Sequence, residues 1–98
     1  MSYVIDLEQV ETQSLRDAVD WVAKDVLEIG GGEGRLARRL AALDASVTAI
    51  DPNVDRVAAA VRLPRDPDQR VIRYCVGDGQ QLPFPREAFD IVVFGWSL

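Results

Sequence analysis

The hydrophobic residues of this chain follow two alternating patterns. Short runs rich in β-branched residues predict β-strands, and they comprise residues 25–29, 46–50, 71–76 and 89–94. Elsewhere apolar residues recur at intervals of three and four, which predicts amphipathic helices over residues 12–23, over residues 35–43 and after Pro52. Strands that alternate with helices through short connections are typical of a parallel sheet with helices on both faces. We therefore expect one α/β domain over residues 1–98, built on a doubly wound sheet.

The helix expected after Pro52 carries its own start signals. Asp51 can cap its first turn, and Pro52 can occupy that turn because its missing N–H is tolerated there. The buried stripe of this helix is expected to comprise Val54, Val57, Ala58 and Val61.

The fourth predicted strand, residues 89–94, is apolar except for Asp90. Strands of this kind are usually covered on both faces and lie inside a parallel sheet. As the last predicted strand it would form an open edge, with unpaired N–H and C=O groups. We expect either that the chain is part of a longer protein or that copies self-associate through this edge. Asp90 itself is expected to be structural.

Composition narrows the possible functions. The chain has 98 residues, 48% of them hydrophobic and 28% charged, with a net charge of −5, which argues against a nucleic-acid surface. It contains no histidine, so histidine-based catalysis and histidine-ligated metal sites are excluded, and no metal is expected. The single cysteine, Cys75, forms no internal disulfide. Without a signal peptide or a long apolar run, the chain is expected to be cytoplasmic and not to bind membranes.

The segment between the first predicted strand and the helix after it contains the strongest candidate for a ligand-binding turn. Glycines at 30, 32 and 34 allow a sharp turn that a ligand can approach closely. The spacing is G-x-G-x-G, which differs from the dinucleotide pattern G-x-G-x-x-G. Glu28 precedes the turn and Glu33 lies within it. Carboxylates there would repel a diphosphate and attract a cation, so the turn favours S-adenosylmethionine over NAD or FAD.

Two aspartates follow later strands. Asp51 lies 21 residues after Gly30, where an acidic residue can accept hydrogen bonds from ribose hydroxyls. It can equally be a simple helix cap. Asp78 follows the third predicted strand and could accept a bond from the adenine amino group, with Gly79 leaving room for the ring. An ordinary turn aspartate is the alternative for Asp78. All these groups are expected at the carboxyl edge of the sheet, near the switch between the first and fourth predicted strands.

Four segments in this order resemble the motifs of class I S-adenosylmethionine-dependent methyltransferases, and the third resembles the small-molecule type. They are residues 25–34, 47–51, 77–85 and 89–93. The resemblance implies a Rossmann-like sheet, of whose usual seven strands this sequence supplies four. It also implies that the chain is the cofactor-binding half, because the family's substrate-contacting segments largely follow the fourth strand.

The resemblance implies a role for each motif residue. Glu28 would act near the amino group of the cofactor, and the turn glycines would hold its methionine part. Asp51 with Pro52 would bind the ribose, and Asp78 with Gly79 the adenine. The segment from Phe94 through Gly95 to Trp96 would lie beside the sulfonium, although Trp96 could equally be a packing residue. The cofactor-binding residues expected from this resemblance are Glu28, Gly30, Gly32, Gly34, Asp51, Pro52, Asp78, Gly79, Phe94 and Gly95.

The expected activity is transfer of a methyl group to a small-molecule acceptor. The sulfonium already activates the methyl group, so alignment is the enzyme's main contribution. The sequence nominates no general base and does not identify the acceptor. Two alternatives stay open: a non-catalytic S-adenosylmethionine-binding or interaction module, and, less favoured by the glycine spacing, an NAD- or FAD-binding oxidoreductase domain.

Overall fold

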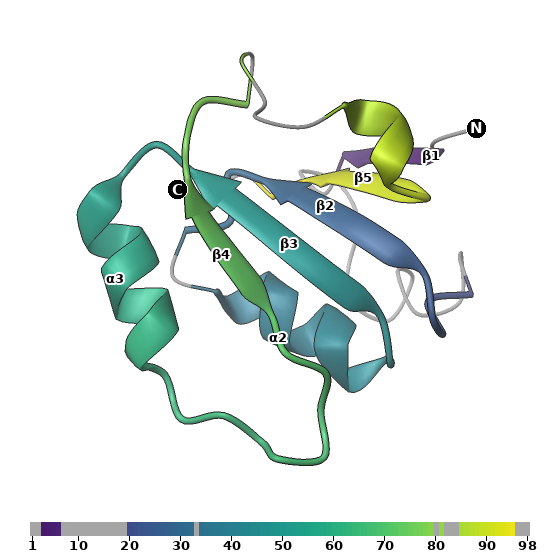
Figure 1. Cartoon of the computed structure of the whole chain (residues 1–98), viewed down its shortest axis with the longest axis horizontal. Helices are drawn as coiled ribbons and strands as arrows, with labels where there is room; N and C mark the ends of the chain where they lie inside the picture. Colours follow the sequence, from purple (N-terminus) through teal and green to yellow (C-terminus); the bar gives the residue numbers. More distant parts are fainter. Residues whose placement is uncertain (1–2, 7–19, 33, 80, 82–84, 96–98) are drawn as a thin grey trace.

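The structure of the chain is a computed structural model that describes residues 3–6, 20–32, 34–79, 81 and 85–95 (Figure 1). Its strands are β1 (Tyr3–Asp6), β2 (Asp25–Ile29), β3 (Ser46–Asp51), β4 (Arg73–Val76) and β5 (Ile91–Phe94). Its helices are α2 (Arg35–Ala42), α3 (Val54–Arg62) and the short 3-10 helix η2 (Arg86–Ala88). The helix predicted over residues 12–23 falls mostly outside the described residues. Its described end, residues 20–23, is not helical, and Ala23 has a φ of 59°.

The five strands form one parallel sheet in the order β1-β5-β2-β3-β4 (Figure 1). From β2 the chain proceeds outward through β3 to β4 and then crosses back, so that β5 pairs with the other side of β2. The direction of winding therefore reverses between β2 and β5. This confirms the parallel α/β architecture and the predicted switch point, which in open α/β sheets is the usual place for a ligand.

The expectation of an open edge on the fourth predicted strand is wrong. That strand, β5, pairs with β2 on one side and with β1 on the other, where Tyr3 aligns with Ile91 and Asp6 with Phe94. The sheet has five strands instead of four because the N-terminal segment adds β1. Because both sides of β5 are hydrogen-bonded, the structure removes the reason to expect self-association through this strand.

The two faces of the sheet are packed differently. On one face, Val26, Val47 and Val93 pack with Leu40 and other buried residues of α2. The α3 helix lies on this face too, because Ala60 and Tyr74 both approach Gly34 at the start of α2.

On the opposite face, Leu27, Ile50 and Val92 form a smaller buried cluster, against which Phe89 and Phe94 pack. Within the described residues, both α-helices therefore flank the first face.

The start and the buried side of α3 differ from the sequence prediction. Asn53, and not Asp51, is the N-cap, and its side chain accepts hydrogen bonds from the backbone N–H groups of Asp55 and Arg56. Pro52 precedes this cap and so lies outside the first turn.

The predicted stripe of α3 is also only partly correct. The helix buries Val57 and Ala60, whereas Val54 and Val61 are each 62% exposed. The helix is thus rotated relative to the predicted stripe, because its contacts are with the edge strand β4 and with β3.

Asp90 has the structural role that we expected. Its Oδ2 accepts a hydrogen bond from the backbone N–H of Asp25 at 2.9 Å, and its own N–H donates to the Asp25 carbonyl at 2.8 Å. This pair joins the starts of β2 and β5. Asp90 and Phe89 precede β5, which begins only at Ile91.

No helix among the described residues is long and apolar enough to cross a membrane. The cytoplasmic location stays a prediction.

Candidate functional site

The carboxyl ends of four strands bring the predicted site residues to one edge of the sheet. The backbone N–H of Gly30, after β2, donates to the carbonyl of Ile50 at 2.8 Å, and the N–H of Gly95, after β5, donates to the carbonyl of Ile29 at 2.9 Å. The N–H of Gly77, after β4, donates to the carbonyl of Asp51 at 3.0 Å. These bonds extend the strand pairing into the loops and hold the loop backbones side by side.

The glycine turn between β2 and α2 depends on the absence of side chains. Gly30, Gly32 and Gly34 have φ values of 78°, 57° and 88°, a region that other residues rarely adopt. A Cβ on Gly30 would also lie only 2.6 Å from the carbonyl oxygen of Gly95. Gly34 is the N-cap of α2 and offers no side-chain acceptor, so the N–H groups of the first turn are left for another partner.

Glu28 is the most unusual residue of this edge. Its side chain is fully buried, and neither Oε1 nor Oε2 has a hydrogen-bond partner among the described residues. The carboxyl group lies directly beneath the loops, because a Cβ on Gly31 would be 2.8 Å from Oε1 and a Cβ on Gly95 would be 3.2 Å from Oε2. Buried polar groups in folded proteins nearly always have a hydrogen-bond partner, so we expect a ligand group to bind this carboxyl group.

The surroundings of Glu28 make its charged form costly. Burial, and secondarily the negative charge of Asp51, raise its pKa from an ordinary value of 4.5 to about 8. A cation placed against the carboxyl group would have the opposite effect and favour its ionised form. The residue is therefore arranged to receive a positive charge.

Asp51 stabilises the turn from the end of β3. It is buried, and its Oδ2 accepts a hydrogen bond from the backbone N–H of Gly32 at 2.9 Å, while Oδ1 accepts one from Asn53 at 2.8 Å. The carboxylate thus ties the glycine turn to the start of α3. Each carboxylate oxygen has two acceptor positions, so these bonds leave capacity for hydroxyl donors.

The other predicted residues lie along the same edge with different surroundings. Asp78 is exposed, and Gly79 lies against Ile29, where a Cβ would be 2.4 Å from Ile29 Cγ2. Phe94 is half-buried and packs on the smaller core cluster, and Pro52 is exposed. All ten predicted positions are described and belong to this edge or to the turn, whereas Trp96 lies outside the described residues.

Sequence reasoning missed Tyr74 as a neighbour of the turn. A Cβ on Gly34 would lie 2.9 Å from the Tyr74 hydroxyl oxygen, so the β4 side chain reaches the start of α2. Burial is the main cause that raises the pKa of Tyr74, the negative charge of Glu28 adds to it, and Arg38 opposes it. The only sequence signal for this contact is alternation along β4, which places Tyr74 on the helix-covered face.

Most of the chain is similar to known proteins. Residues 26–98 match a protein family described as a methyltransferase domain. A ubiquinone biosynthesis O-methyltransferase of Bradyrhizobium diazoefficiens is 40% identical over 68 residues, which are 69% of this chain and 26% of that protein.

Two solved structures share the fold. The YcgJ protein of Bacillus subtilis superposes with a TM-score of 0.72 at 23% identity, over 82% of this chain and 35% of that one. An arsenic(III) S-adenosylmethionine methyltransferase of Chlamydomonas reinhardtii superposes with a TM-score of 0.67 at 21% identity, over 90% of this chain and 36% of that one.

This chain therefore spans about a quarter of the matched O-methyltransferase and about a third of these structures. The family match covers most of its length and includes the glycine turn, Asp51 and β5. The chain belongs to the methyltransferase domain family.

Proposed function

We propose that this chain is the cofactor-binding part of an S-adenosylmethionine-dependent methyltransferase that acts on a small molecule. The observation that carries the proposal is the fully buried carboxyl group of Glu28 beneath the glycine turn, which has no hydrogen-bond partner among the described residues. Family membership supports the cofactor class, and the small-molecule acceptor rests on the resemblance of residues 77–85 and on the matched O-methyltransferase.

The chemistry of the site fits this cofactor. S-adenosylmethionine carries an ammonium, a sulfonium and one carboxylate. The ammonium can ion-pair with Glu28, and the carboxylate can accept hydrogen bonds from the first turn of α2, where the helix dipole favours negative charge. A diphosphate would instead bring further negative charge to an edge that already holds Glu28 and Asp51.

The other residues of the edge would each contact a different part of the ligand. Asp51 would accept the ribose hydroxyls beside Pro52, and Asp78 with Gly79 would hold the adenine. Phe94 and Gly95 would lie beside the reacting sulfur. The residues proposed to hold the cofactor are Glu28, Gly30, Gly32, Gly34, Asp51, Pro52, Asp78, Gly79, Phe94 and Gly95.

When bound, the cofactor supplies a methyl group activated by its sulfonium. The residues of this chain contribute binding and orientation, which can account for most of the acceleration of an in-line displacement. Glu28 would hold one end of the ligand and Asp51 its ribose, and these two contacts would limit how the ligand can lie in the site. We assign no general base to this chain.

Calorimetric titration tests the proposal. The chain should bind S-adenosylmethionine and S-adenosylhomocysteine more tightly than NAD⁺, and Glu28→Gln should weaken both adenosyl ligands. Glu87→Gln, an exposed carboxylate of η2, is the matched control and should change neither affinity. Tighter binding of NAD⁺, or equal effects of the two variants, would contradict the proposal.

A further inference from the structure

A hollow lies apart from the residues proposed to hold the cofactor. It has a volume of about 280 Å³ and lies between α2, α3 and the segment of residues 63–72 that leads into β4. None of the ten residues proposed to hold the cofactor lines it. A ligand in this hollow would therefore occupy a site separate from the glycine turn.

The floor of the hollow is apolar. Leu63, Ile72 and Tyr74 line it and are each half-buried. Val61 and Val71 also line it, although they are 62% and 57% exposed. A compact apolar group seated here would cover these valines, which are among the most exposed large hydrophobic residues described.

Arginines surround this floor. Arg38, Arg65 and Arg70 line the hollow, and among the described residues Asp66 is the only carboxylate that lines it. Asp44 pairs with Arg70, so the excess of positive charge at the hollow comes from Arg38 and Arg65, on a chain whose net charge is −5. The charge pattern favours an anion over a cation.

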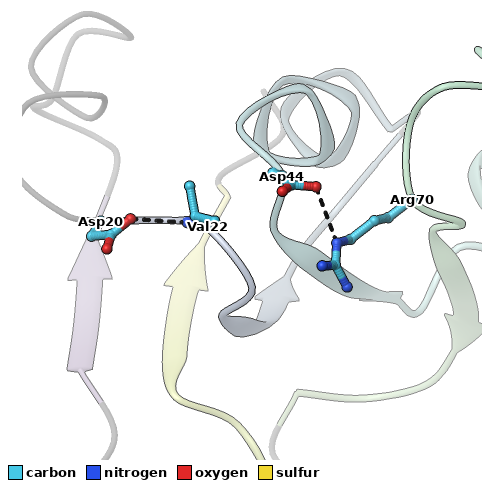
Figure 2. A network of polar contacts seen from close by, with 4 residues as sticks. All are labelled: Asp20, Val22, Asp44 and Arg70. Carbon is cyan, nitrogen blue, oxygen red and sulfur yellow. Dashed lines mark hydrogen bonds and ion pairs between the residues drawn. The ribbon is translucent and has the colours of Figure 1, made fainter.

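Two of the three guanidinium groups are held by the protein and remain able to donate. A terminal nitrogen of Arg38 donates to the carbonyl of Pro64 at 3.3 Å. Arg70 pairs through Nε with Oδ1 of Asp44 at 3.1 Å, and this ion pair does not use its two terminal nitrogens (Figure 2). Guanidinium groups oriented in this way can bind carboxylate or phosphate oxygens through paired hydrogen bonds.

We propose that this hollow, which we name the arginine pocket, binds a small anion with an apolar body, such as an aryl carboxylate or an aryl phosphate monoester. The ring would rest on Leu63, Ile72 and Tyr74, and the anionic group would face Arg38 and Arg65. The volume, just below the range of about 300–1,000 Å³ for ligand sites, suits a single ring with its acidic group.

The arginine pocket shares residues with the surroundings of Gly34, the last glycine of the turn. Tyr74 lines the pocket, and its hydroxyl oxygen lies against Gly34. Arg38 is one helical turn further along α2, and its backbone N–H donates to the Gly34 carbonyl at 3.0 Å. The bound anion would thus contact two residues that touch the last glycine of the turn.

Titration of the labelled chain by two-dimensional NMR tests the proposal, with benzoate, phenyl phosphate and neutral benzyl alcohol as probes at 150 mM salt. At least one anion should saturate and shift the amide signals of Val71 and Tyr74. It should bind about tenfold more tightly than benzyl alcohol, a difference of about 1.4 kcal/mol.

The variants Arg65→Gln and Arg38→Gln should each lower the affinity for the anion severalfold. Arg62→Gln is the matched control, because Arg62 is exposed at the end of α3 and does not line the pocket. Equal binding of benzyl alcohol, no saturable shift at these amides, or an equal loss in Arg62→Gln would overturn the proposal. The last outcome would show that only the general field of the surface attracts the anion.

Discussion

The buried carboxyl group of Glu28 should make the stability of the unliganded chain fall as pH rises. Its pKa is about 8 in the folded chain, against an ordinary value of 4.5. Below pH 4.5 the group is protonated in both the folded and the unfolded states, so folding has no ionisation cost. Between pH 4.5 and 8 the unfolded chain releases this proton while the folded chain retains it, which stabilises the unfolded state.

The magnitude follows from that difference. Each pH unit in the window lowers the free energy of unfolding by about 1.4 kcal/mol, so the loss at pH 7 is about 3 kcal/mol. Glu28→Gln cannot ionise and has nearly the same shape, so it removes this loss. We therefore expect the variant to be more stable than the parent chain at pH 7 by about 3 kcal/mol, and the two to converge near pH 4.5.

Urea unfolding followed by circular dichroism at pH 5, 6, 7 and 8 measures this difference. Glu87→Gln provides the control, because it removes an exposed carboxylate and should parallel the parent chain at every pH. A difference between Glu28→Gln and the parent that does not grow between pH 5 and 7 would contradict the raised pKa of Glu28. So would a variant that is less stable than the parent at pH 7.

Three further predictions concern the same edge. Binding of S-adenosylmethionine should displace the proton of Glu28, so the affinity measured by calorimetry should rise about ninefold from pH 6 to pH 7. The ligand's own amino group stays largely protonated over this range. Glu28→Gln should show no such rise. Asp51→Ala should weaken the binding of S-adenosylmethionine by about 1–3 kcal/mol, as for lost hydrogen bonds to a charged group. An unchanged affinity would contradict the role of Asp51 in binding the ribose. Gly31→Ala should lower the free energy of unfolding by about 1–3 kcal/mol, because its methyl group would lie 2.8 Å from Oε1 of the fully buried Glu28 and 3.0 Å from Ala49 Cβ. Unfolding curves identical to those of the parent would contradict this.

Local patterns were sufficient to predict the strands that surround the site. The run from Asp25 to Ile29 and the run from Ser46 to Asp51 are short, rich in β-branched residues and followed by turn residues, so both were predicted to within one residue. Parallel pairing then brings their carboxyl ends to one edge, which is why the glycine turn and Asp51 could be placed together from sequence.

The strand β1 could not be predicted in this way. Tyr3–Asp6 is too short to show a period, and its pairing with Ile91–Phe94 joins opposite ends of the chain. Likewise, the apolar spacing in α3 suggested a stripe that includes Val54 and Val61, but the buried side is decided by packing against β3 and β4. Both errors concern contacts between segments, which local periodicity does not encode.

The sequence predicts that Glu28 lies near a ligand, but it does not predict that the side chain is buried or that its pKa is raised. Burial of the group depends on Gly31 and Gly95, which come from two loops and leave just enough space for its carboxyl oxygens. Two further contacts could not be predicted from the sequence, because each joins segments that are distant along the chain. They are the hydrogen bond from Gly32 to Asp51 and the contact of Tyr74 with Gly34. The convergence of these residues at one edge of the sheet could therefore be predicted from the sequence, whereas the burial and the pKa of Glu28 required the structure.

A crystal structure of the chain with S-adenosylmethionine would test the central claim most directly. We expect the ligand's ammonium within hydrogen-bonding distance of the Glu28 carboxylate, and its ribose hydroxyls on Asp51. A ligand that leaves the Glu28 oxygens without a partner, or that turns its carboxylate toward them, would contradict the account.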